Sequence, residues 1–416
     1  MMRWGRVFSW ALLVVLVAVL GIAPLLAAPE ETLSLAFLAG FKEDVLRANI
    51  GAFVQKTGIR VDIDTAPYND LYKKELLSLS TGARRYDVLF MDEPWVPALA
   101  SFLLPLGDVV KEVGASDFVP TTLAAGQYDG TQYTLPVDPN VLFFIYRKDL
   151  FQERGLRPPD TWADVLRDAQ ILNDPGKGIA GFDVTAGSDI QTFAYLTTFL
   201  WSWGVEILDQ NGRAAVDTPA AREAAEYYVN ILKYCPPAVR SYTFADVTKT
   251  MQLGKAAMAV QWASGARPLE DKANSLVAGK LGYIVLPKGV RRTPMRGVWT
   301  IGIAKTTSKR DAARKFVEWI TSRDFGMAAA LYPATSSAIH SPRVSVLSDP
   351  RVQQALPYAP ALLQSLRIAK SRPRVPQWPD IQEQIRLAGS RITTGEVSVA
   401  AGLRELAASI NRIMSK

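Results

Sequence analysis

Cysteine and histidine are almost absent from this sequence, and their scarcity excludes several kinds of protein chemistry. Cys235 is the only cysteine, so no disulfide can form within one chain. His340 is the only histidine, which rules out a zinc site built from several histidine or cysteine ligands. A Ser-His-Asp triad would have to use His340, which follows Ser336 and Ser337 in a loop-like stretch without a nucleophile-elbow pattern. We expect His340 on the surface, and we predict no catalytic residue, metal or cofactor.

Nucleotide-binding motifs are also missing. No phosphate-binding loop with Gly-Lys-Ser/Thr is present, so the chain is not the ATPase of a transporter. The segment 176–181 fits G-x-G-x-x-G, but Asn173-Asp174-Pro175 precedes it where a dinucleotide site needs a strand. The basic residues that give the net charge of +7 are spread along the chain and do not alternate with aromatic residues. We therefore predict a solvated basic surface and no nucleic-acid partner.

The first 28 residues have the composition of an export signal. Arg3 and Arg6 precede the nearly continuous apolar stretch 7–26, and Ala27-Ala28-Pro29 follows. About 20 apolar residues are also enough to span a bilayer as a helix. We predict that residues 1–28 are a signal peptide or an uncleaved anchor. Both alternatives place the rest of the chain in the periplasm or elsewhere outside the cytoplasm.

Segments typical of strands and helices alternate in the first hundred residues. This alternation predicts an α/β fold with a mostly parallel sheet. The 416 residues exceed the about 250–300 residues that one core usually holds, so we expect two lobes. The expected strands are 32–38, 59–65 and 86–91, and the expected helices are 42–57 and 71–81.

Seven segments follow one another in an order that is specific, although each match is weak evidence alone. They are 86–92 with Trp95, 129–136 followed by 144–151, 155–162, 254–258, 297–299 and 372–376. Together they resemble the extracellular solute-binding proteins of family 1, a group that includes maltose-binding-like proteins. Val298 departs from the pattern, because the family has a second glycine before the tryptophan.

The resemblance implies a two-lobe periplasmic-binding-protein type II fold with a ligand cleft between the lobes. We expect an N-terminal lobe of residues 29–137 and 296–343, and a C-terminal lobe of residues 138–295 and 344–416. The implied function is binding without chemistry, as the extracytoplasmic component of an ABC transporter. Such a protein captures a sugar by closing its lobes and delivers it to the permease subunits in the membrane. We expect it to act as a monomer.

A sugar presents hydroxyl groups around its edge and C–H groups on its faces, so its site needs fixed polar groups and flat aromatic platforms. Core packing is the competing interpretation for the tryptophans, a helix cap for the acids beside Pro94, and surface exposure for the arginines. The candidate platforms are Trp262, Trp299 and Trp378. The candidate hydrogen-bonding residues are Asp92, Glu93, Asp138, Asn140, Arg372 and Arg374.

Two alternatives remain open at the level of sequence. The ligand of such a binding protein could instead be glycerol phosphate or another anionic solute, which the basic charge balance suggests, or a polyol. An extracytoplasmic glycoside hydrolase would need two carboxyl groups about 5–10 Å apart on either side of the scissile bond. The adjacent Asp92 and Glu93 project differently and share no obvious partner, so we favour binding over hydrolysis.

Overall fold

The computed structural model describes residues 31–333 and 339–415. The predicted export signal at residues 1–28 lies outside the described residues. Within the described part, no helix is both long and apolar enough to cross a membrane.

The first hundred residues form the alternating pattern that the sequence predicts. Strand β1 pairs in parallel with both β2 and β3, and helices α1 and α2 make the two connections. Helix α1 ends at Gly58, whose positive φ of 70° suits a residue without a side chain. The expected elements are confirmed with small shifts at their ends. Their bounds are β1 (Thr32–Leu38), α1 (Phe41–Thr57), β2 (Arg60–Ala66), α2 (Tyr68–Ser80) and β3 (Val88–Asp92).

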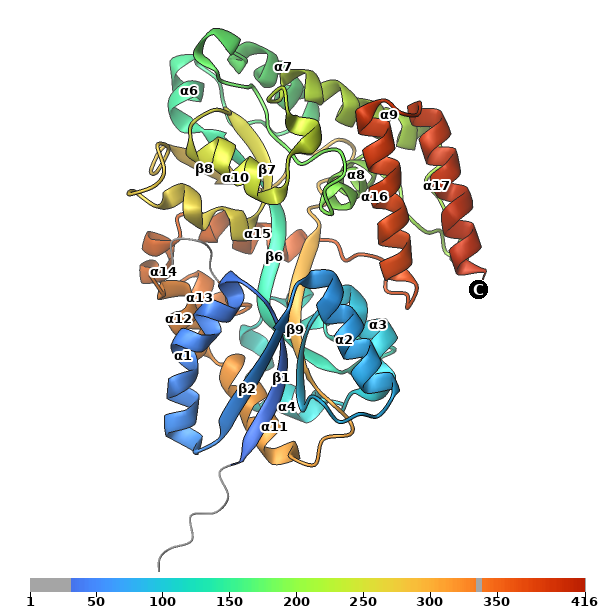
Figure 1. Cartoon of the computed structure of the whole chain (residues 1–416). Coiled ribbons are helices and arrows are strands. Elements are labelled where there is room, and N and C mark those ends of the chain that lie inside the picture. The colour runs from blue at the N-terminus through green and yellow to red at the C-terminus, as the bar shows by residue number, and fades with distance from the viewer. Residues whose placement is uncertain (1–30, 334–338, 416) are drawn as a thin grey trace, which may run out of the picture. The chain divides into compact units, whose positions relative to one another are not determined.

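The long strand β6 joins two parts of the main sheet. The sheet has the order β2-β1-β3-β9-β6-β7, and β8 also pairs with β6. The first half of β6 pairs with β9, whereas its second half pairs with β7 and β8. Figure 1 shows β6 rising from the part of the sheet that holds β1 and β2 to the part that holds β7 and β8. The remaining strands are β4 (Gln127–Tyr128), β5 (Thr131–Gln132), β6 (Thr134–Arg147), β7 (Met258–Trp262), β8 (Leu281–Ile284) and β9 (Arg296–Ile303).

Helices cover both parts of the sheet, and Figure 1 shows α16 and α17 side by side next to α8 and α9. The helices after α2 are α3 (Val96–Leu99), α4 (Gly107–Glu112), α5 (Pro120–Ala124), α6 (Lys148–Glu153), α7 (Trp162–Leu172), α8 (Thr192–Ser202), α9 (Pro219–Ile231), α10 (Phe244–Gln252), α11 (Arg310–Ile320), α12 (Arg323–Leu331), α13 (Val344–Leu347), α14 (Pro350–Ala355), α15 (Ala359–Ile368), α16 (Trp378–Thr394) and α17 (Val399–Met414).

Buried apolar side chains gather in separate clusters. One surrounds β1, β3 and the end of β9, and includes Phe37, Phe53 and Phe90. Another lies under α7, α8, α9, α16 and α17, and includes Trp162 and Trp201. A further cluster packs β6 against α15. Separate cores on the two parts of the sheet are what a chain of this length is expected to form.

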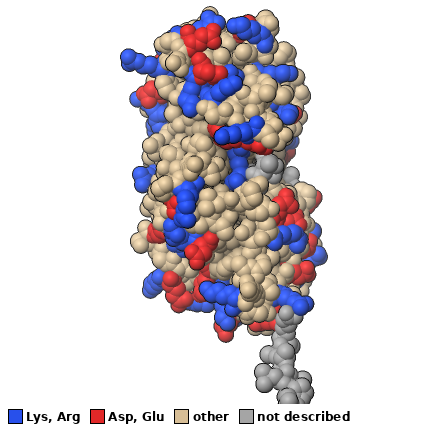
Figure 2. Space-filling view, turned by 90° about the vertical axis from the view of Figure 1, so that its left-hand side faces the viewer, with Lys and Arg blue, Asp and Glu red and all other residues tan. Residues whose placement is uncertain are grey.

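The charged surface mixes both signs. Figure 2 shows lysine and arginine side chains interspersed with aspartate and glutamate over the face that it presents. Charged residues of opposite sign form surface ion pairs, for example Lys288 with Asp160 at 2.9 Å. Exposed pairs of this kind contribute little to stability, typically below about 1 kcal/mol.

Candidate functional site

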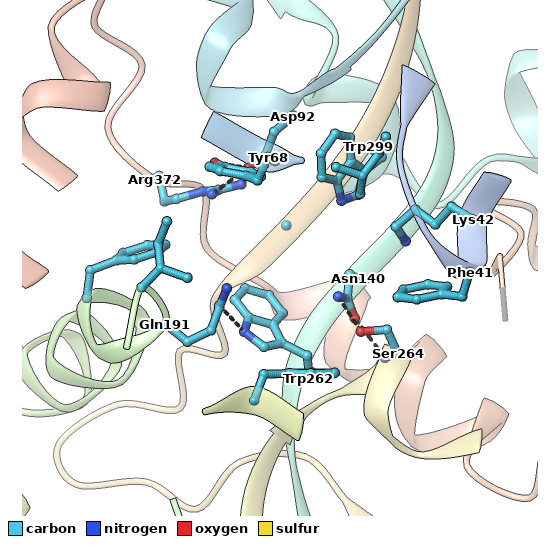
Figure 3. Close-up of a pocket in the computed structure, with 15 residues that line it drawn as sticks. Phe41, Lys42, Tyr68, Asp92, Asn140, Gln191, Trp262, Ser264, Trp299 and Arg372 are labelled. Carbon is cyan, nitrogen blue, oxygen red and sulfur yellow. Dashed lines mark hydrogen bonds and ion pairs between the residues drawn. The ribbon is translucent and has the colours of Figure 1, made fainter. Parts of the chain in front are cut away.

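A cavity of about 220 Å³ opens where strands of the two sheet parts end. The carboxyl ends of β1, β3 and β7 reach it, together with the first turns of α1, α2, α8 and α10. Ligand sites in α/β sheets commonly form at such strand ends, where the order of the strands reverses. The lining residues, drawn in Figure 3, are Leu38, Phe41, Lys42, Tyr68, Asp92, Asn140, Ile190, Gln191, Phe193, Phe244, Trp262, Ser264, Gly297, Trp299 and Arg372.

Asp92 and Arg372 form a buried fork on one side of the cavity. Arg372 Nη1 donates to Asp92 Oδ2 at 2.9 Å, and Nη2 donates to Oδ1 at 2.6 Å. The Tyr68 hydroxyl also donates to Asp92 Oδ2, at 2.8 Å. Burial opposes the charge on Arg372, but the neighbouring Asp92 carboxylate outweighs it and raises the pKa of the guanidinium. Arg372 Nε has no hydrogen-bond partner among the described residues, so one buried donor stays unsatisfied.

Trp299 forms a wall of the cavity and is also part of a core. It lies on β9, directly opposite Asp92 on β3. Its ring stacks on Phe90 with centroids 5.1 Å apart, and the rings of Tyr68 and Trp95 meet it edge-on. Only 7% of its surface is exposed. Trp299 therefore combines the two roles that sequence analysis treated as alternatives, core packing and a place at the cleft.

Trp262 sits at the end of β7, and its orientation is fixed by a hydrogen bond. Its Nε1 donates to Gln191 Oε1 at 2.8 Å. Because the amide oxygen of Gln191 is engaged, its NH₂ group is left as a donor. Gly297 allows the ring to approach β9, since a Cβ atom there would lie 3.1 Å from the ring of Trp262.

Asn140 connects the crossing strand β6 to the turn after β7. Its Oδ1 accepts from the backbone N–H of Ser264 at 3.1 Å, and its Nδ2 donates to Ser264 Oγ at 3.1 Å. Two parts of the chain that are 124 residues apart are thereby held together at the cavity wall.

Four residues that sequence analysis proposed do not line this cavity. Glu93 is fully buried and accepts from Arg296 Nε at 2.8 Å. Arg374 donates to the backbone oxygens of Glu93 and Gln127. Trp378, the first residue of α16, packs in a core, and its Nε1 donates to Gln382 Oε1. Asp138 lies behind Lys42 and contacts its Nζ.

The expectation that His340 lies on the surface is wrong. Its side chain is fully buried, its backbone N–H donates to Asp138 Oδ1 at 2.8 Å, and its Nε2 lies 3.2 Å from the Tyr358 hydroxyl. Burial lowers the pKa of His340 to about 3, so the ring is neutral at physiological pH. Because these partners form hydrogen bonds with the polar atoms of His340, the residue can be buried without contact to water.

Lys42, Tyr68 and Gln191 line the cavity but were not found from the sequence. Lys42 follows β1 and Tyr68 follows β2, so the strand-end rule that selected Asp92 applies to both. Gln191 lies in a loop without a recognisable pattern, and only its contact with Trp262 reveals it. The aromatic lining residues Phe41, Phe193 and Phe244 were missed in the same way.

This fold and cavity define a class, the two-lobe binding proteins with a ligand cleft between the lobes. The family model for bacterial extracellular solute-binding proteins matches residues 38–326, and the chain belongs to this family. It is therefore an extracytoplasmic solute-binding protein of the kind that serves ABC transporters.

Three similar proteins illustrate the family. A probable amino-acid ABC transporter periplasmic-binding protein of Sinorhizobium fredii is 26% identical over 80% of this chain and 76% of its own. The mannitol-binding protein of Pseudomonas aeruginosa is 25% identical over 84% of this chain and 85% of its own. The structure of a solute-binding protein from Agrobacterium radiobacter in complex with ribitol has a TM-score of 0.82 and 27% identity, and covers 92% of this chain and 98% of that one.

Proposed function

We propose that the protein binds a small neutral polyhydroxy compound, either a monosaccharide or a linear polyol. The observation that carries this proposal is the pairing of charges around the cavity. Arg372 is matched by Asp92, and Lys42 is matched by Asp138, which contacts its Nζ. Burial also lowers the pKa of Lys42 to about 7, although Asp92 opposes this shift. A site without an unmatched charge favours a neutral ligand over glycerol phosphate or another anion.

The size and lining of the cavity support a short ligand. Its volume of about 220 Å³ is below the about 300–1,000 Å³ that is usual for drug-sized ligands. Trp299 and Trp262 supply flat apolar surface for C–H groups, and the polar groups around them suit hydroxyls. The relatives that bind mannitol and ribitol point in the same direction.

The lining also supports binding without chemistry. Asp92 is the one carboxylate among the lining residues that the structure describes, and both of its oxygens accept from Arg372. A glycoside hydrolase uses two carboxyl groups, one of them as a proton donor. We infer that the bound solute is handed unchanged to ABC permease subunits.

Three further features belong to the same proposal. Residues 1–28 direct export, and the protein acts as a monomer. The N-terminal lobe comprises residues 29–137 and 296–343, and the C-terminal lobe comprises residues 138–295 and 344–416. The change of pairing partner along β6, between Val141 and Leu142, supports a lobe boundary in this strand.

A thermal-shift screen tests the ligand class. The panel contains mannitol, ribitol, tagatose, glucose, maltose, glycerol 3-phosphate and representative amino acids. A compound that binds only the native state adds RT ln(1 + [L]/Kd) to the unfolding free energy and thereby raises the melting temperature. We expect stabilisation by a monosaccharide or polyol. Stabilisation by glycerol 3-phosphate or an amino acid alone would overturn the proposal.

A further inference from the structure

Lys42 closes the side of the cavity opposite Arg372. It lies in the first turn of α1, and only 3% of its surface is exposed. Its Nζ lies 4.9 Å from the ring centroid of Phe41 and 5.9 Å from that of Trp299. Figure 3 shows Lys42 and Arg372 on opposite sides of the space that Trp299 and Trp262 enclose.

The amine of Lys42 has donors to spare. Asp138 is the one hydrogen-bond partner of Nζ among residues 31–333 and 339–415. A lysine ammonium group has three N–H donors and its neutral amine has two, so at least one donor remains beyond the bond to Asp138 in either form, and a buried donor without a partner is costly. The rings of Phe41 and Trp299 are weak acceptors at best, so the remaining donors depend on what occupies the cavity.

Hydrogen bonds on the side away from the cavity fix the carboxylate of Asp138, so it cannot turn toward the cavity. Its Oδ1 accepts from the backbone N–H of His340 at 2.8 Å and lies 3.2 Å from the ring Nδ1. Its Oδ2 contacts Lys42. The neutral His340 is in turn held by Tyr358, which directly precedes α15. Asp138 therefore reaches a ligand only through Lys42, whose side chain it orients.

We propose that Lys42 is a specificity-determining residue that donates to one hydroxyl oxygen of the ligand, with Asp138 as its positioning residue. This inference rests on the proposed function. According to this proposal, the two sides of the cavity contact different parts of the ligand. Asp92 and Arg372 hold one part of the polyhydroxy chain, and Lys42 selects for a hydroxyl group on the opposite side.

The test pairs a protein variant with ligands that lack one hydroxyl. Lys42→Met alone would leave Asp138 buried without a counter-charge, so the main variant is Lys42→Met with Asp138→Asn. The probes are D-mannitol and D-glucose with their monodeoxy derivatives, measured by titration calorimetry. Lys74→Met is the matched control, because Lys74 forms a partly exposed ion pair with Asp64.

We expect the double variant to fold and to lose about ten- to hundredfold in affinity, as for a lost hydrogen bond to a charged donor. One deoxy derivative should show a similar loss with the wild type and no further loss with the variant. The Lys74→Met protein should bind like the wild type.

Two results have distinct meanings. The role of Lys42 is overturned if the folded double variant binds as tightly as the wild type, or if it shows the same loss of affinity for every missing hydroxyl. Either result leaves the proposed function intact. A wild type that binds neither mannitol nor glucose overturns the proposed function in these ligands, and the role of Lys42 with it. Melting curves without ligand show in each case whether the variant is folded.

Discussion

Arg372 and Asp92 bind each other through two parallel hydrogen bonds, although 280 residues separate them in the sequence. Asp92 ends β3, whereas Arg372 lies in the segment between α15 and α16. In the proposed division of the chain, this pair joins the two lobes at the edge of the cavity. It therefore contributes both to the shape of the site and to its closure.

Removing only one charge of this pair should lower the stability more than removing both charges. Arg372→Met leaves a buried carboxylate without its counter-charge, and we expect a loss of about 3–5 kcal/mol in unfolding free energy. The double variant Arg372→Met with Asp92→Asn should recover most of that stability, because no unpaired charge remains. Urea unfolding without ligand measures both effects. A double variant less stable than Arg372→Met would contradict this account of the pair.

Substitutions of Trp299 and Trp378 should distinguish a tryptophan that lines the ligand site from one that only packs in a core. Trp299→Ala removes a ring that packs on Phe90 and lines the cavity, so we expect a loss of about 3–5 kcal/mol in stability and about 1–3 kcal/mol in ligand affinity. Trp378→Phe changes a fully buried ring outside the cavity and should lower stability while affinity stays unchanged. Calorimetry and urea midpoints on the same preparations provide the comparison. Equal losses of affinity in both variants would show that the effect of Trp299 is indirect.

Glu75 should make the stability depend on pH. Its side chain is fully buried on α2, its two oxygens have no hydrogen-bond partner among the described residues, and burial raises its pKa well above the ordinary value. The native state therefore keeps a proton that the unfolded state releases above pH of about 4.3. The contribution of Glu75 to stability is fully present below that pH, and it falls as pH rises toward the raised native pKa.

Glu75→Gln removes this titration and keeps the shape of the side chain. The variant should gain stability relative to the wild type by up to about 1.4 kcal/mol for each pH unit within this range. Urea unfolding between pH 4 and pH 8 measures the difference, and Glu226→Gln on the exposed face of α9 is the control. A difference between Glu75→Gln and the wild type that does not change with pH would refute the prediction.

Local patterns predicted the first three strands but not the rest of the sheet or the whole site. The expectation of a mostly parallel sheet is wrong, because β6, β7, β8 and β9 all pair antiparallel, through contacts between segments far apart in the sequence. The alternation of strands and helices predicted β1 to β3, and the position of Asp92 at a strand end placed it at the cavity. Trp378 shows the limit, because a tryptophan suits a sugar platform and a core equally and the sequence does not say which way the ring faces. His340 shows another, since its burial depends on Asp138, which is 202 residues away. Contacts across such distances decide which polar groups face the ligand.

The central claim is that the cavity binds a neutral polyhydroxy solute, and direct calorimetric titration of the wild type tests it most simply. Mannitol, ribitol and glucose should include at least one ligand that binds with one-to-one stoichiometry and a Kd of about 1 μM or tighter, near −8 kcal/mol. Glycerol 3-phosphate should not bind under the same conditions. Binding of glycerol 3-phosphate, or of an amino acid, with no heat from any polyol or monosaccharide, would contradict the account.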